Sequence, residues 1–337
     1  MIIYTGGTIG MEKDPDRGTL KPFDFDNIVE SIPELNKFGY DIQAHSFSPA
    51  IDSSNIQPAI WIKIADLIEQ EYDNFDGFVV LHGTDTMAYS ASALSFMMEN
   101  LSKPVIFTGA QLPIGTLRTD GKENLITAIE IASAYENGKP VVPEVCIYFE
   151  SKLYRGNRTT KVNAEHFNAF QSANYPYLAK AGVNLVYNRE FILPPGEGKP
   201  LLVHRNFSDQ ITILKLFPGI NKEYMDAILE IPGLRAVILE TYGSGNAPSE
   251  PWFIDRMQRA VERGIILLDV TQCSRGSVEL GRYETSKSLL DAGVISGYDI
   301  TTEAATTKLM ILLGQELTVN EIKMLLNKSL KGEITLA

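Results

Sequence analysis

The chain has 337 residues, of which 44% are hydrophobic and 21% charged, and its net charge is −12. This length predicts two domains, and the composition is that of an ordinary globular protein. The negative charge argues against nucleic acid or an anionic membrane surface as a partner, and no apolar stretch approaches the roughly 18 residues that cross a bilayer. Because the sequence opens without a secretory leader pattern, we expect a cytoplasmic protein.

Apolar runs and helical patterns alternate through the first half of the chain. We expect strands at residues 2–4, 41–48, 76–81, 103–109 and 141–149, and helices at 24–32, 60–72, 88–100 and 123–137. Residues 11–22 are predicted to form an exposed loop, either an ordinary connection or a segment that closes over a ligand. The order of strand, loop and helix predicts a doubly wound, mainly parallel α/β sheet.

A stretch rich in proline and glycine at residues 189–200 (REFILPPGEGKP) is predicted to be a linker. A second α/β pattern follows it, with strands expected at 211–217, 236–239 and 265–270 and helices at 250–263, 286–292, 302–313 and 318–327. The sequence therefore predicts a larger N-terminal catalytic α/β domain over residues 1–188 and a smaller C-terminal α/β domain over residues 201–337.

Polar segments follow several of the predicted strands. Residues 5–10 (TGGTIG) and 82–87 (HGTDTM) are threonine-bearing turns at strand ends, which is the edge of an open α/β sheet where ligands bind. Residues 52–54 (DSS) could contact a ligand or cap the next helix. The segment 154–161 (YRGNRTTK) is either a solvated basic turn or the source of a lysine for a buried active site.

Spacing excludes several kinds of site. The chain has no Gly-x-Ser-x-Gly motif, its glycines do not match the phosphate-loop or dinucleotide-binding patterns, and its four histidines form no spaced ligand pair. We therefore expect no metal and no cofactor. His82 is expected to be structural, and Cys146 and Cys273 are expected to be buried free thiols.

Hydroxyl chemistry remains. Thr8 lies between glycines that let backbone amides approach a substrate carbonyl, and Thr84 is followed by the carboxylate of Asp85. A threonine hydroxyl is a poor nucleophile near neutral pH, so it needs a base or a proton relay. Lys161 could supply that relay, with Asp85 holding its charge.

Four segments resemble a known family. Residues 5–10 and 77–87 are similar to the two signature motifs of the bacterial-type L-asparaginase/glutaminase family. Residues 154–161 and 242–248 (YGSGNAP) make the likeness closest to the cytoplasmic type I L-asparaginases. The likeness runs from Ile3 to beyond Leu330 and implies hydrolysis of L-asparagine to L-aspartate and ammonia.

The resemblance implies roles for the catalytic candidates. The hydroxyl of Thr8 would attack the amide carbon and form a β-aspartyl ester, which water then cleaves. Thr84 would position or activate the attacking group. Lys161 and Asp85 would carry protons and hold the charges.

The resemblance also implies substrate contacts and an assembly. Asp52, Ser53 and Ser54 match the substrate-binding stretch, which together with Thr84 and Asp85 grips the α-amino and α-carboxylate groups. Asn246 falls in a turn that family members present near a neighbouring subunit's site, in a homodimer or a dimer-of-dimers tetramer.

The sequence departs from the family pattern at two positions. The mobile loop of the family supplies a tyrosine, whereas here no tyrosine occurs between Tyr4 and Tyr40, and Thr19 is the nearest counterpart. Glu240 stands where some regulated type I members carry an arginine.

Other functions remain open at this point. One extra methylene in a substrate is worth only about 1–3 kcal/mol of discrimination, so an L-glutaminase or mixed amidase is an alternative. An amidotransferase subunit acting on charged tRNA would need an added N-terminal domain and a surface suited to tRNA. A non-catalytic amino-acid sensor would be favoured by a substituted Thr8, Thr84, Asp85 or Lys161, and all four residues are present.

Overall fold

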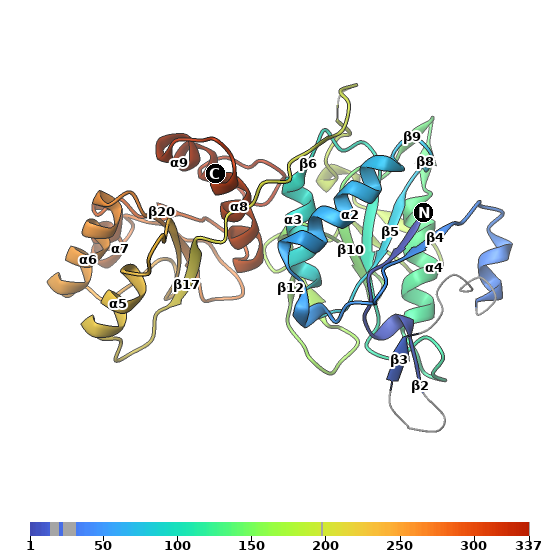
Figure 1. Ribbon diagram of the computed structural model, residues 1–337, viewed down its shortest axis with the longest axis horizontal. Helices are drawn as coiled ribbons and strands as arrows, with labels where there is room; N and C mark the ends of the chain where they lie inside the picture. The colour runs from blue at the N-terminus through green and yellow to red at the C-terminus, as the bar shows by residue number, and fades with distance from the viewer. Residues whose placement is uncertain (14–19, 23–31, 197, 337) are drawn as a thin grey trace. The chain divides into compact units, whose positions relative to one another are not determined.

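The computed structural model describes residues 1–13, 20–22, 32–196 and 198–336 (Figure 1). The chain forms two compact units, Met1–His204 and Arg205–Ala337. The stretch at 189–200 lies at the end of the first unit, and its role as a linker stays a prediction. Among the described residues, no helix is long and apolar enough to cross a membrane.

The first unit is built on an eight-stranded sheet in the order β15-β14-β11-β10-β7-β5-β1-β4. Its parallel strands are β4 (Ala44–Ser46), β1 (Ile2–Tyr4), β5 (Phe78–Leu81), β7 (Val105–Thr108) and β10 (Val145–Phe149). Three antiparallel strands follow, β11 (Lys152–Arg155), β14 (Ala179–Lys180) and β15 (Val186–Tyr187). The predicted mainly parallel sheet is confirmed.

Helices cover both faces of this sheet, which is why β5, β7 and β10 are continuous apolar runs (Figure 1). Helix α4 (Gly121–Ala132) shares a core with alternate residues of the strands, among them Ile2, Val79 and Ile106. Helix α3 (Met87–Met97) consists mostly of small and apolar residues and is buried almost all round. It packs against α2 (Pro58–Gln70) and the short helix η5 (Gly156–Arg158).

The second unit has a four-stranded parallel sheet of β17 (Ile211–Lys215), β18 (Ala236–Thr241), β19 (Ile266–Thr271) and β20 (Ile295–Ser296). A hydrophobic core joins this sheet to α5 (Lys222–Leu229), α6 (Pro251–Glu262) and α7 (Glu284–Asp291). Helix α8 (Thr302–Gly314) also contacts the sheet and is followed by α9 (Val319–Leu326). A buried ion pair between Lys308 and Glu333 attaches the segment after α9 to α8.

Several local predictions were wrong. The ends of the expected loop at 11–22 pair as antiparallel strands, β2 (Met11–Lys13) and β3 (Leu20–Pro22). Helix α4 ends at Ala132, because Asn137 and Gly138 have positive φ angles of 51° and 76° and turn a hairpin between β8 (Tyr135–Glu136) and β9 (Lys139–Pro140). Helix α5 was missed. The expected helix at 24–32 lies outside the described residues, apart from Ile32.

Two further predictions also differ from the structure. The helix expected at 88–100 ends at Met97, because β6 (Met98–Glu99) pairs with β16 (Leu202–Val203). Cys146 is a buried free thiol as expected, whereas Cys273 is exposed. Cys273 lies beyond the end of β19 rather than within the apolar run, so the strand does not bury it.

Candidate active site

The loops that follow β1, β4 and β5 are joined at one edge of the first unit's sheet. The N–H of Thr5, after β1, donates to the carbonyl of Leu81 at the end of β5 (3.0 Å). The N–H of Ile51, after β4, donates to the carbonyl of Thr5 (2.8 Å). The loops that carry Thr8, Asp52 and Thr84 therefore lie together, because parallel strands place their carboxyl ends at one edge of the sheet.

Glycines let these loops touch backbone to backbone. Gly7 has a φ of 91°, and a Cβ atom built on it would lie 2.5 Å from the backbone nitrogen of Gly83. A Cβ atom on Gly83 would collide with the side chain of Ser53. The two threonine turns and the turn at 52–54 are thus in direct contact, and Thr8 and Thr84 each follow one of the touching glycines.

Thr8 begins the short helix η1 (Thr8–Gly10), which Tyr4 holds in place. The Tyr4 hydroxyl donates to the carbonyl of Gly10 (3.0 Å), and a Cβ atom on Gly10 would collide with the Tyr4 ring. Burial raises the pKa of Tyr4 to about 12, so this hydroxyl remains a donor at neutral pH. Thr8 itself is half-buried.

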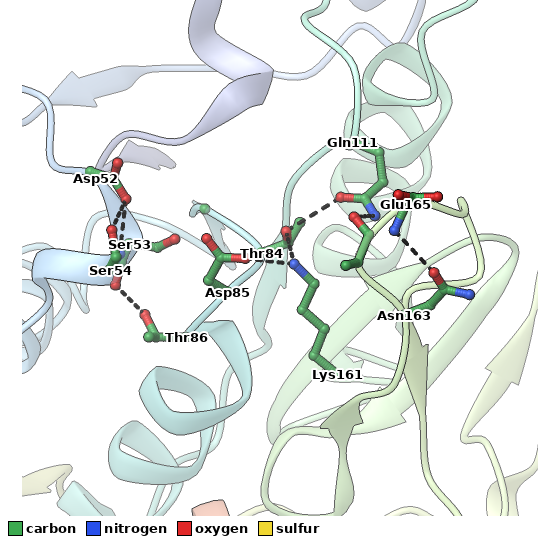
Figure 2. A network of polar contacts seen from close by, with 12 residues as sticks. Asp52, Ser53, Ser54, Thr84, Asp85, Thr86, Gln111, Lys161, Asn163 and Glu165 are labelled. Carbon is green, nitrogen blue, oxygen red and sulfur yellow. Dashed lines mark hydrogen bonds and ion pairs between the residues drawn. The ribbon is translucent and has the colours of Figure 1, made fainter.

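Lys161 links Thr84 to Asp85. It lies in β12 (Thr160–Lys161), which pairs with β13 (Phe170–Gln171). Its Nζ donates to Thr84 Oγ1 (2.8 Å) and to Asp85 Oδ1 (2.7 Å) (Figure 2). The Lys161 side chain is 17% exposed and that of Asp85 is 63% exposed, so the network lies where the protein meets solvent.

The segment before Lys161 is buried, so the solvated-turn alternative was wrong. Arg155 Nε donates to Glu144 Oε2 (2.7 Å), and the two side chains are only 3% and 5% exposed. The guanidinium groups of Arg155 and Arg158 also lie over the Tyr175 ring. Gly156 packs against Ala91 of α3. The composition of this segment does not reveal these partners, which are distant in the sequence.

His82 is structural, as expected, and orients the loop that carries Thr84. Its Nδ1 lies 2.7 Å from the carbonyl oxygen of Gly83, which only accepts, so we assign the ring proton to Nδ1. Its Nε2 then accepts from the Ser90 hydroxyl (2.9 Å), which in turn accepts from Trp61 Nε1 (2.9 Å). Burial lowers the pKa of His82 to about 4, so the ring is neutral.

Asp52 caps a short helix, η4 (Ser53–Asn55), rather than α2. Its Oδ1 accepts from the backbone N–H of Ser54 (2.9 Å) and from the Ser54 hydroxyl (2.6 Å), and these two bonds hold the pKa of Asp52 below its usual value. Both bonds end on Oδ1, which leaves Oδ2 as the oxygen suited to an ammonium group. Thr86 donates to the carbonyl of the buried Ser53 (2.7 Å), which fixes this turn beside the Thr84 loop.

Sequence reasoning missed Gln111, which follows β7 in the loop before α4. Its Oε1 lies 3.4 Å from Thr84 Oγ1, and its Nε2 donates to the carbonyls of Ala164 (3.3 Å) and His166 (3.0 Å) (Figure 2). One signal was present in the sequence. β7 is a neighbour of β5 in the parallel sheet, so a polar residue just after its end lies at the same edge as Thr84.

Asn246 and Glu240 make their described contacts within the second unit. Asn246 lies in the second unit, in the turn after β18, where its Oδ1 accepts from the Thr285 hydroxyl (2.8 Å). Its contribution to a neighbouring subunit's site stays a prediction. Thr19 lies outside the described residues. The carboxylate of Glu240 pairs with Lys215 (3.4 Å) and accepts from the Thr302 hydroxyl (2.8 Å).

The arrangement is suited to acyl chemistry. Thr8, Thr84 and Asp85 lie on adjoining loops, and the amine of Lys161 contacts two of them. Amines, hydroxyls and carboxylates of this kind can move protons to and from an attacking hydroxyl. Within the described ranges, no group of three or more His, Cys, Asp or Glu side chains is placed to hold a metal ion.

Two family models match most of the chain. The model for "Asparaginase, N-terminal" matches residues 1–193, and the model for "Glutaminase/Asparaginase C-terminal domain" matches residues 210–326.

Curated relatives and solved structures agree with these matches. The chain is 43% identical over 335 residues to L-asparaginase 1 of Escherichia coli (strain K12), covering 99% of this chain and 97% of the relative. It is 41% identical over 360 residues to the 60 kDa lysophospholipase of Mus musculus, covering 100% of this chain but only 62% of that longer protein. The crystal structure of L-asparaginase I from Vibrio cholerae matches with a TM-score of 0.91 and 43% identity, covering 99% of this chain and 98% of the other.

Proposed function

The chain belongs to the asparaginase family, and from that membership we propose that it hydrolyses the side-chain amide of L-asparagine to L-aspartate and ammonia. One observation carries the proposal. Lys161 Nζ contacts both Thr84 Oγ1 and Asp85 Oδ1. The loop that carries Thr84 and Asp85 touches, backbone to backbone, the loop that carries Thr8. Identity over nearly the whole chain to an L-asparaginase supports this substrate.

The proposed mechanism has two acyl-transfer steps. Thr8 Oγ1 bonds to the amide carbon, the carbon–nitrogen bond breaks, and the threonine proton leaves with the amine as ammonia. Water then adds to the β-aspartyl ester, the ester bond breaks, and Thr8 regains its proton. Thr84 positions the attacking group, while Lys161 and Asp85 pass protons and balance the charges that develop in each step.

The turn at 52–54 is the proposed binding site for the amino-acid end of the substrate. The exposed Asp52 carboxylate would pair with the α-ammonium group, with help from Asp85. The Ser53 and Ser54 turn would bind the α-carboxylate. Asn246 of a neighbouring subunit would complete the site in a homodimer or homotetramer, and the cytoplasm is the proposed location.

L-Glutamine is the alternative substrate, because the same mechanism applies to an amide one methylene longer. The family model that matches residues 210–326 covers glutaminases as well as asparaginases, which favours testing both amides together. A sensor that binds asparagine without cleaving it is the alternative from another class.

Ammonia release from L-asparagine and L-glutamine, measured for the wild type and Thr8→Ala, tests the proposal. We expect asparagine turnover that falls at least about a thousandfold in Thr8→Ala, as for loss of a nucleophile that acts with a base. Thr212→Ala, in β17 of the second unit, is the matched control and should keep wild-type turnover.

Each other outcome revises a different part. Preference for glutamine would keep the mechanism and change the substrate. Binding of asparagine without ammonia would identify a sensor. Undiminished activity in Thr8→Ala would show that another residue is the nucleophile.

A further inference from the structure

The hydroxyl proton of Thr84 has a fixed direction in this structure. The ammonium form of Lys161 only donates, so Thr84 Oγ1 must accept from it (2.8 Å). A hydroxyl has one proton and two lone pairs, and its proton needs an acceptor elsewhere. Gln111 Oε1, 3.4 Å away, is that acceptor.

The orientation of the Gln111 amide is also determined by its contacts. Its other terminal atom faces the carbonyl oxygens of Ala164 and His166, which only accept, so this atom is the nitrogen. The oxygen therefore faces Thr84. A turn shapes the accepting loop, because Asn163 Oδ1 accepts from the N–H groups of Glu165 (3.0 Å) and His166 (3.1 Å) (Figure 2).

The backbone of Gln111 is held from the other side by Asp120. The carboxylate of Asp120 accepts from the backbone N–H of Gln111 (3.0 Å) and of Leu112 (3.1 Å). Asp120 occupies the N-cap position of α4 but makes no capping bond with its side chain. Its carboxylate thus holds the loop after β7 in place rather than capping the helix.

We propose that Gln111 is a positioning residue that directs the Thr84 proton away from the reacting centre. With one lone pair accepting from Lys161 and the proton given to Gln111, the second lone pair of Thr84 Oγ1 stays available to accept from the attacking hydroxyl or water. Without Gln111, the Thr84 hydroxyl can rotate and donate towards the substrate, which blocks that lone pair. The inference rests on the proposed amide hydrolysis, and it adds a residue that acts through Thr84.

The test is a double-mutant cycle on ammonia release. Gln111→Met removes the acceptor and keeps the side chain at nearly the same length. It is introduced into three backgrounds: the wild type, Thr84→Ser, which keeps a hydroxyl, and Thr84→Val, which has none. We expect kcat to fall about 5- to 10-fold in the first two backgrounds, the size of one neutral hydrogen bond, with KM changed less than about twofold. In Thr84→Val, we expect no further change in kcat. Gln258→Met, in α6 of the second unit, is the matched control.

The alternatives give different results. An unchanged kcat in Gln111→Met overturns the inference, as does an equal loss in Thr84→Val, which would mean that Gln111 acts independently of Thr84. Equal melting temperatures with and without Gln111→Met in each background would show that the loss of kcat does not come from a destabilised fold. Gln111→Leu replaces Gln111→Met if the latter does not fold. A wild type that releases no ammonia would instead overturn the proposed function.

Discussion

The side-chain amine of Lys161 lies 2.8 Å from the hydroxyl of Thr84, although 77 residues separate them in the sequence. Thr84 follows a strand of the parallel sheet, whereas Lys161 arrives from the antiparallel part through a buried segment. The catalytic candidates therefore depend on two different parts of one unit, so each part can be tested separately.

We expect Lys161→Met to abolish most activity and leave the fold intact. Loss of a group that transfers protons lowers kcat by about a hundred- to ten-thousandfold. The free energy of unfolding should change by less than about 1 kcal/mol, because the partner Asp85 is mostly exposed. Ammonia release and urea unfolding check this, with Lys180→Met in β14 as the control. Activity within tenfold of the wild type would contradict a proton-transfer role.

We expect Gly7→Ala to destabilise the first unit and to inactivate the protein. The new Cβ atom would lie 2.5 Å from the backbone nitrogen of Gly83, so the loops after β1 and β5 would have to move apart. Gly219→Ala is the matched control, since Gly219 has a similar φ of 98° but a Cβ atom added there would meet nothing within 4 Å. In the control, the free energy of unfolding should fall only by the cost of the strained backbone, about 1–3 kcal/mol. In Gly7→Ala it should fall further. Equal losses would show that the contact with Gly83 is unimportant.

His82 should make stability fall in acid. Its folded pKa is about 4, below the ordinary 6.5, so between these values the unfolded chain binds a proton that the folded chain does not. The stabilisation is complete above pH 6.5 and is lost as pH falls towards 4, with a slope of up to about 1.4 kcal/mol per pH unit. Urea unfolding between pH 5 and 7 should show that the free energy of unfolding depends less steeply on pH in His82→Gln than in the wild type. The exposed His45→Gln is the control, and identical slopes for all three proteins would contradict the buried neutral ring.

Asp269 in β19 should have the opposite effect. Burial raises the pKa of this carboxyl from 3.8 to about 7, against the hydrogen bond from Thr241 (2.6 Å), and its Oδ2 has no partner among the described residues. The folded chain binds the proton between these pH values, so stability is complete below pH 3.8 and is lost as pH rises towards 7. Asp269→Asn should therefore raise the melting temperature relative to the wild type at pH 8 more than at pH 5. Asp291→Asn, at an exposed aspartate, is the control. A difference that does not depend on pH would contradict the prediction.

Much of the fold could be predicted because the apolar runs in the sequence coincide with the buried parallel strands. The runs at β5, β7 and β10 are apolar on both faces, and the turns after β1 and β5 contain glycines where the loops touch. Helix α5 was missed because its signal is a local cap, in which Asn221 accepts from the N–H of Tyr224, rather than a long period.

The candidate site was only partly predictable for a different reason. Thr84 and Asp85 lie in a recognisable motif. Gln111 is identified only by its hydrogen bonds with residues 84, 164 and 166, which are distant in the sequence or on another loop. Arg155 likewise reads as a solvated cation until Glu144 is placed beside it. Pairings of this kind depend on strand order, which the local pattern of residues does not contain.

The contact of Gly7 with Gly83 limits how this protein can diverge. A side chain at either glycine would displace two loops together. Few substitutions at these positions would therefore be tolerated during selection for a new amide substrate. The exposed loop at residues 164–168 lies outside that contact, and its side chains can vary one at a time. We expect laboratory evolution towards longer amides to accumulate its accepted changes in this loop and to leave both glycines untouched.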